Sequence, residues 1–189
     1  MATTPNTTNF NSPLENFITS VKSGGLAKPN RFKIRIQPPR LLNYALNTAR
    51  LASMYCEVTN FPFLNLNVKQ QVVYGPAYQR PVGMEFGGEG ITVTFLLDKD
   101  MTIKSFFEEW MFIVVNPTSF NVSYQSDYIS EMVISQLDEN ENEKYRVSFV
   151  DVFPRSMNIV ELNSTAQNQF HRLSVTFAYR KWLPAAQKR

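Results

Sequence analysis

Apolar residues near the N-terminus recur at the three- and four-residue spacing of a helix. Ser12-Pro13-Leu14-Glu15 forms a capping box with Pro at the first helical position, and Gly24-Gly25 supplies left-handed backbone for the helix end. The pattern predicts a short amphipathic helix, which is marginally stable alone and must pack on something. Its apolar stripe consists of Leu14, Phe17, Ile18 and Val21.

A wider apolar stripe predicts a second helix in the middle of the chain. Asp98 or Asp100 can cap its start, and Asn116-Pro117 ends it. An aromatic face of this width is typical of a helix that covers a sheet rather than of a cofactor site. The stripe consists of Ile103, Phe106, Phe107, Trp110, Met111 and Val114.

Most of the remaining chain alternates between apolar and polar residues with period two, which predicts strands. Gly75-Pro76 separates two of them as a hairpin turn, and prolines place that hairpin at a sheet edge or in a loop. Residues 138–143 are predicted to form an acidic hairpin turn, Gly87–Gly90 a hinge or bulge, and residues 41–52 are ambiguous, with helical spacing but no caps. The strands are expected at residues 31–37, 54–60, 66–74, 77–84, 91–97, 131–137, 145–153 and 173–180.

These elements predict a mainly β fold with some helix. Hairpins dominate and no β-α-β rhythm is seen, so the expected architecture is an antiparallel β-sandwich or small barrel with one amphipathic helix packed on it. The expected organisation is an N-terminal arm and short helix over residues 1–22, one β domain over residues 23–184, and a basic tail over residues 185–189.

Composition narrows the classes of function. The chain has 189 residues, of which 43% are hydrophobic and 19% charged, as in an ordinary folded domain. The net charge of +3 is spread singly along the chain rather than concentrated as in a nucleic-acid footprint. No apolar run is long enough to span a membrane, and no secretory signal is expected.

The chain offers little chemistry for catalysis. Cys56 and His171 are its only cysteine and histidine, which excludes an intrachain disulfide and every Cys/His zinc pattern. Cys56 is expected to be a small buried hydrophobe. The Gly87–Gly90 run leads into a strand rather than a helix, so it is not a phosphate-binding loop, and Glu108-Glu109 diverge on a helix surface. The predicted protein is not an enzyme and holds no cofactor or metal.

The exposed strand edges instead predict self-association. A monomer would be expected to cover the edges of polar-faced strands, because they invite pairing with other chains. An oligomer uses these edges, since a ring in which each subunit continues the sheet of the next one has no edge.

Several sequence blocks, in order from about residue 23 to residue 183, resemble the tail tube proteins of contractile-tailed bacteriophages. The resemblance extends to the tubes of contractile bacteriocins and of type VI secretion. The blocks are Ser23-Gly24-Gly25-Leu26-Ala27-Lys28-Pro29-Asn30-Arg31-Phe32, Cys56-Glu57-Val58-Thr59-Asn60-Phe61-Pro62, Ile91-Thr92-Val93-Thr94-Phe95 followed by Phe106-Phe107-Glu108-Glu109-Trp110, Asp151-Val152-Phe153-Pro154, and Val175-Thr176-Phe177-Ala178-Tyr179-Arg180-Lys181-Trp182.

The resemblance implies a structural subunit that self-assembles into hexameric rings, in which six subunits share one continuous inner β-barrel. The rings would stack into the tube through which DNA is ejected without specific binding. Implied partners are the tail sheath, baseplate and tape-measure proteins, with no membrane anchor. The implied location is the virion, after assembly in the host cytoplasm.

Two sets of residues are candidates for that role. Ser174 and Thr176 are small, polar and uncharged, which suits a channel that must not hold DNA. The candidate inter-subunit contacts lie at the end of the first helix and on the hairpin. They are Gly24, Gly25, Lys69, Gln71, Tyr74, Tyr78 and Arg80.

Other functions remain open at this stage. A related baseplate protein could form a single ring on which the tube polymerises. A monomeric β-barrel could bind a small apolar ligand in its interior. A single-stranded nucleic-acid binder could use Tyr74 and Tyr78 for stacking and Arg80 for phosphate contact.

Overall fold

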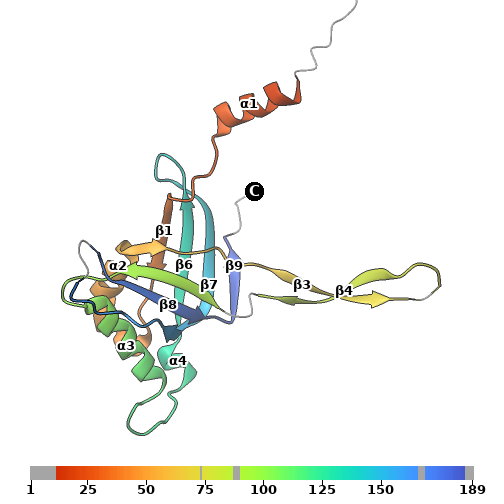
Figure 1. Ribbon diagram of the computed structural model, residues 1–189. Coiled ribbons are helices and arrows are strands. Elements are labelled where there is room, and N and C mark those ends of the chain that lie inside the picture. The colour runs from red at the N-terminus through yellow and green to blue at the C-terminus, as the bar shows by residue number, and fades with distance from the viewer. Residues whose placement is uncertain (1–11, 73, 87–89, 166–168, 186–189) are drawn as a thin grey trace, which may run out of the picture.

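The computed structural model describes residues 12–72, 74–86, 90–165 and 169–185 (Figure 1). Its strands form a seven-stranded antiparallel sheet and a separate two-stranded hairpin, which confirms the predicted mainly β class. The strands of the large sheet are β1 (Phe32–Ile36), β2 (Cys56–Val58), β5 (Ile91–Leu96), β6 (Ser130–Leu137), β7 (Glu143–Met157), β8 (Arg172–Ala178) and β9 (Lys181–Pro184). The hairpin is β3 (Asn65–Gln71) and β4 (Tyr78–Glu85). The helices are α1 (Pro13–Gly24), the 3-10 helix η1 (Arg40–Ala45), α2 (Leu46–Met54), α3 (Thr102–Val114) and α4 (Gln125–Tyr128).

The large sheet turns a corner in the middle of β7. Its order is β1-β6-β7-β8-β5-β2, with β9 also paired to β7. The first half of β7 pairs with β6 and β9, and its second half pairs with β8. At the corner Asp151 has φ 58°, and its carboxylate forms an ion pair with Arg180 at 2.6 Å. The two halves therefore run across each other and enclose the core like an open barrel (Figure 1).

The core lies between the sheet and α3. Alternate residues of β5 and β8 point inward and are buried, as the period-two pattern predicts. Trp110 of α3 is fully buried, and its indole Nε1 donates a hydrogen bond to the Tyr128 carbonyl at 2.8 Å. The ring of Phe107 packs edge-on against Phe177 with centroids 5.7 Å apart. The predicted helix over the sheet is therefore confirmed, and large side chains fill the space beneath it.

Asp98 caps α3, as one of the two predicted candidates. Its carboxylate accepts hydrogen bonds from the backbone N–H groups of Thr102 and Ile103, both at 3.2 Å. The residue immediately before the helix is Met101, in left-handed conformation, so Asp98 reaches the free amides from one turn away. Asp100 makes no such contact in the described part of the chain.

Gly90 lies immediately before β5, at the predicted hinge or bulge, although residues 87–89 of that segment lie outside the described residues. Its φ of 92° favours glycine. A Cβ at this position would also lie 2.3 Å from the Phe177 carbonyl oxygen. Both the conformation and the close approach of β8 therefore require glycine here.

Several predicted boundaries are wrong. The strand expected at residues 54–60 is only β2, because α2 continues through Met54. The ambiguous segment 41–52 is helical, as η1 and α2, with Ala49 and Ala52 fully buried. These two small side chains lie in the core, and Ser53 Oγ of α2 accepts a hydrogen bond from the Ile36 N–H of β1 at 3.2 Å.

The strand expected to end at Phe153 extends to Met157. Pro154 does not stop it, because the register shifts between Pro154 and Ser156 and a bulge tolerates the missing amide. Neither α4 nor β9 was predicted, since each is a single short turn or strand held by tertiary contacts. In the described segments, every helix is too short or too polar to cross a bilayer.

Candidate functional site

The predicted hairpin β3–β4 projects away from the body of the molecule (Figure 1). Among the described strands, β3 and β4 pair only with each other. The predicted contact residues on it are brought together in two cross-strand pairs, Lys69 with Arg80 and Gln71 with Tyr78. Tyr74 lies at the turn and is 99% exposed. These side chains form a polar face that is open to a partner.

The opposite face of the hairpin is apolar, which the sequence-based reading missed. Leu66 lies opposite Met84, and Val68 follows Leu66 on the same face because strand residues alternate. All three side chains are exposed, as is Val82 at the bulge. An isolated two-stranded hairpin is marginally stable in water, so this apolar face indicates a partner. The signal was present in the sequence, as the alternation of Leu66 and Val68 with asparagine and lysine.

Helix α1 also stands away from the body, at the end where β1, β6 and β7 meet the 138–143 turn (Figure 1). Its predicted capping box is present: Ser12 Oγ accepts from the Glu15 N–H at 3.2 Å, and Glu15 accepts from the Ser12 N–H at 3.1 Å. Gly24 ends the helix and Gly25 has φ 69°, as expected of a helix end. The apolar stripe is exposed, with Leu14 65% and Phe17 61% accessible.

The segment after α1 is tied to the body by polar contacts. Lys28 Nζ lies 2.6 Å from Glu139 Oε1 in the acidic turn. Gln136 Nε2 donates to the carbonyl oxygens of Lys28 at 2.8 Å and of Arg31 at 2.7 Å. A groove of about 910 Å³ lies between this segment and the turn, with Val21, Leu26 and Leu137 among its lining residues. These contacts fix the point at which α1 leaves the body, while the apolar stripe of the helix stays exposed.

A third exposed apolar surface lies beyond the end of α3. We name it the distal patch and define it as Phe112, Phe120, Val122 and Tyr124. The loop that carries it is held by backbone hydrogen bonds, from the Asn116 N–H to the Asn121 carbonyl at 3.0 Å and from the Phe120 N–H to the Asn116 carbonyl at 2.8 Å. Phe120 is nonetheless 78% exposed. Sequence reasoning used this segment only to end the helix, and therefore missed it.

The predicted channel residues lie on the outward face of β8. The Ser174 and Thr94 hydroxyls are 3.0 Å apart, and so are those of Thr176 and Thr92. Each hydroxyl therefore has a partner across the β5–β8 pair. At the edge of this face, Arg172 makes a two-pronged ion pair with Glu57 at 2.6 and 3.0 Å. The hydrogen bond and charge of Arg172 lower the pKa of the Glu57 carboxyl. The hydroxyls and the ion pair of this face are therefore satisfied within the chain.

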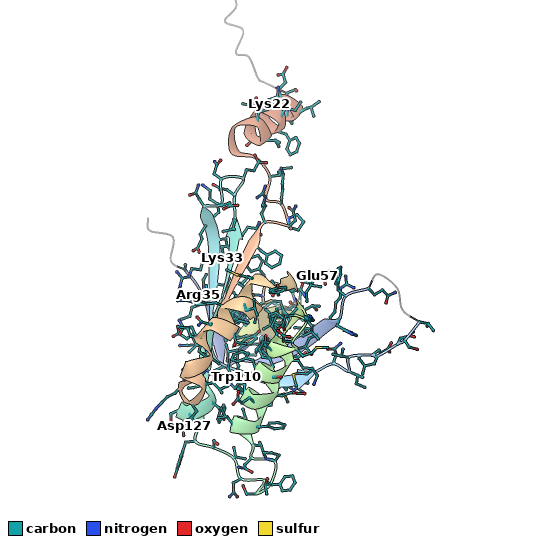
Figure 2. The ribbon with its side chains drawn as sticks, turned by 90° about the vertical axis from the view of Figure 1, so that its left-hand side faces the viewer. Lys22, Lys33, Arg35, Glu57, Trp110 and Asp127 are labelled. Carbon is teal, nitrogen blue, oxygen red and sulfur yellow. The ribbon has the colours of Figure 1, made fainter. Side chains whose placement is uncertain are left out.

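The outward face of the other half of the sheet is more basic. Lys33 and Arg35 point outward from β1, and both are labelled in Figure 2. They line a small hollow of about 50 Å³ together with Arg146, Glu143 and the buried Ser135. The outward surfaces of the two halves of the sheet thus differ: that of β5 and β8 carries paired hydroxyls, and that of β1 carries Lys33 and Arg35.

The lone cysteine is not an activated nucleophile. Burial raises the pKa of the Cys56 thiol to about 12, so the thiol is neutral and weakly nucleophilic at physiological pH. Cys56 packs against the core but is half-buried rather than buried as predicted. The described residues contain no cluster of three or more His, Cys, Asp or Glu side chains that could hold a metal ion.

Comparison with known proteins gives a single family. The model of the phage tail tube protein family matches residues 27–185. No curated protein sequence matches the chain.

Solved structures share the fold at low sequence identity. A chain of the PVC sheath–tube complex, from an extracellular contractile injection system in the extended state, is 11% identical with a TM-score of 0.60, covering 89% of this chain and 97% of that one. The tube-terminating cap of the anti-feeding prophage is 12% identical with a TM-score of 0.59, covering 86% and 92%. A chain of the sixfold-symmetrised anti-feeding prophage baseplate is 11% identical with a TM-score of 0.58, covering 87% and 98%. At these identities the likeness shows the fold alone.

Proposed function

The chain belongs to the phage tail tube protein family, and from that membership we propose that it is the repeating structural subunit of a tail tube. Copies form hexameric rings with a shared inner β-barrel, and the rings stack into the conduit for DNA ejection. The tube lies inside a sheath and starts on a baseplate, in the virion. A structurally similar chain comes from a sheath–tube complex, and another from a sixfold-symmetrised baseplate, which supports this arrangement.

One observation carries the proposal: the body buries its apolar side chains within one chain, whereas the projecting elements leave theirs exposed. Trp110 and its neighbours fill the interior, which leaves no room there for the small apolar ligand of the alternative reading. The apolar face of the β3–β4 hairpin is exposed. Because water-exposed apolar patches of this kind are characteristic of interfaces, the hairpin is a contact between subunits. Lys69, Gln71, Tyr74, Tyr78 and Arg80 form its polar rim.

The face of β5 and β8 lines the channel. Its hydroxyls, including Ser174 and Thr176, hydrogen-bond to one another, and Arg172 at its edge is paired with Glu57. Lys and Arg side chains attract phosphate, so a basic lining would retard DNA. This hydroxyl-lined face therefore suits passage better than the face that carries Lys33 and Arg35.

The test is self-assembly of the purified full-length chain. We expect sedimentation velocity to show large particles and negative-stain electron microscopy to show hollow tubes or stacked rings. Val68→Asp should prevent assembly by placing a charge on the apolar hairpin face, whereas Leu162→Asp should not. Leu162 is a matched control, 83% exposed but far from the hairpin in the chain.

Each other outcome has a defined meaning. A species near 22 kDa at every concentration would contradict the proposal. Single rings that never stack would assign the chain to the baseplate protein on which a tube polymerises. Tight, salt-sensitive binding of oligonucleotides, lost in Arg80→Ala, would favour the nucleic-acid reading.

A further inference from the structure

Helix α1 lies outside the part of the chain that the family model matches, which begins at residue 27. Its function has to be argued from its own residues. Leu14, Phe17 and Ile18 form an exposed stripe on one side of the helix, and Val21 continues it. Lys22, in the last turn, makes no ion pair within the described residues. A short helix with an uncovered apolar stripe needs a surface to pack on.

The distal patch has the features of such a surface. Four large exposed apolar side chains lie on one loop and on the adjoining end of α3, and two of them are phenylalanines. Hydrogen bonds hold the loop in shape: Asn116 Oδ1 accepts from the Thr118 and Ser119 N–H groups at 2.9 and 3.1 Å, and the Ser123 N–H donates to the Val114 carbonyl at 3.1 Å. A preorganised loop loses little entropy on binding, and exposed aromatic side chains are typical anchors of interfaces.

The two surfaces lie at opposite ends of the molecule. Figure 1 shows α1 beyond one end of the body and the loop after α3 beyond the other. In Figure 2 the same separation is marked by Lys22 at one end and Asp127 of α4 at the other. The stripe and the patch of one chain therefore cannot meet. Two different surfaces that face opposite directions are the arrangement of a head-to-tail contact, which repeats without limit when the rotation does not close.

We propose that α1 of one copy packs its apolar stripe on the distal patch of a second copy in the next ring. The occupant is another copy of this chain because the proposed function is self-assembly and each molecule carries an uncovered apolar surface at both ends. The charges also match: Lys22 borders the stripe, and Asp127 lies three residues beyond Tyr124 of the patch. This inference rests on the proposed function, and it assigns the stacking contact to residues that the family match does not include.

The experiment uses two variants of the full chain, Phe17→Asp and Phe120→Asp. Both side chains are exposed, so neither change disturbs the core, and thermal unfolding of the dissociated chains checks this. We expect each variant to form single rings but no tubes in negative-stain electron microscopy and sedimentation velocity. Leu162→Asp is again the matched control and should form tubes.

Mixing the two preformed variants gives the sharper result. A Phe17→Asp ring keeps its distal patch and a Phe120→Asp ring keeps its helix, so one good contact can form between them but not a second. The expected product is therefore a stack of two rings that grows no further. A symmetric contact between like surfaces would give no such pairing.

A charge exchange tests the contact in a second way. Lys22→Glu alone and Asp127→Lys alone should each shift the concentration for stacking upward, and the double variant should recover it, because in a head-to-tail contact the reversed charges face each other. If neither single variant changes the concentration needed for stacking and the double variant does not lower it, the proposed alignment is overturned.

The failures are distinguishable. If the wild-type chain forms tubes and both aspartate variants do so equally, the stacking contact is wrong and the proposed function stands. If the variants dissociate to monomers instead of single rings, α1 acts within a ring and the head-to-tail assignment is overturned. If the wild-type chain itself stays monomeric, the proposed function fails and this inference fails with it.

Discussion

The body and the projecting elements use the same kinds of residue in opposite ways. Phe107 and Trp110 of α3 are fully buried, whereas Phe17 of α1 and Phe120 of the distal patch are 61% and 78% exposed. Aromatic side chains dominate the energetics of cores and of interfaces alike. A single chain therefore buries the apolar side chains of its body but leaves those of its projecting elements exposed. Its projecting elements present core-like surface that a partner must cover.

The largest effect on the body is expected from Trp110→Ala. The substitution empties the centre of the core and leaves the Tyr128 carbonyl without its indole donor. Loss of a large buried aromatic side chain typically costs about 3–5 kcal/mol in the free energy of unfolding. Urea unfolding of the dissociated chain measures it. A loss below 1 kcal/mol would mean that this site is not the centre of the core.

Gly90→Ala should have the next largest effect on the free energy of unfolding. The added Cβ meets the Phe177 carbonyl in β8, and the backbone has a φ that alanine disfavours. Strain of this kind costs roughly 1–3 kcal/mol in the free energy of unfolding. Gly25→Ala is the matched control, since it has positive φ but nothing near its added Cβ. Equal losses in the two variants would show that conformation alone, and not the approach of β8, decides the effect.

Asp98→Ala should remove the cap of α3 and cost about 1 kcal/mol in the free energy of unfolding at neutral pH. Partial burial raises the pKa of the Asp98 carboxyl, but hydrogen bonds from Thr102 and Ile103 outweigh it and hold that pKa below its usual 3.8. A carboxylate with a lowered folded pKa stabilises the fold above its unfolded pKa and loses this contribution as the pH falls through the folded value. The difference between wild type and variant should therefore shrink in acid, below about pH 4. A difference that grows in acid would contradict this role.

The smallest effect on the body is expected from Val68→Ser on the hairpin. This side chain is exposed in the single chain, so the free energy of unfolding should change by less than about 0.5 kcal/mol. The concentration needed for assembly should nonetheless rise, because the hairpin face is less apolar. Stability is measured by urea unfolding and assembly by sedimentation velocity. A clear fall in the free energy of unfolding alongside the weaker assembly would remove the distinction between body and projections.

The sequence predicted the body better than the surfaces. The alternation in β5 and β8 and the stripe of α3 are patterns of burial within one chain, so periodicity detects them. Asp98 could be named as a cap because its side chain acts within one turn of sequence. The extents of β2 and β7 could not be read, because α2 packing and the corner at Asp151 are tertiary effects.

The candidate contact residues stay a prediction, although the structure shows where they lie. Lys69 and Arg80 do lie together on the projecting hairpin, because the turn at Gly75 sets the register. The apolar hairpin face and the distal patch were missed, since an exposed valine or phenylalanine looks the same in sequence as a buried one. Only the three-dimensional arrangement shows that no described residue covers Phe120.

Amide hydrogen exchange, compared between the assembled and the dissociated chain, tests most directly that the projecting elements are subunit contacts. The account predicts that assembly slows exchange strongly in α1, in the β3–β4 hairpin and in residues 115–124, because their surfaces become covered and their local opening is suppressed. Exchange in α3 and the buried part of β8 should change little, since these elements are already protected. Unchanged exchange in all three projecting segments of an assembled particle would contradict the account.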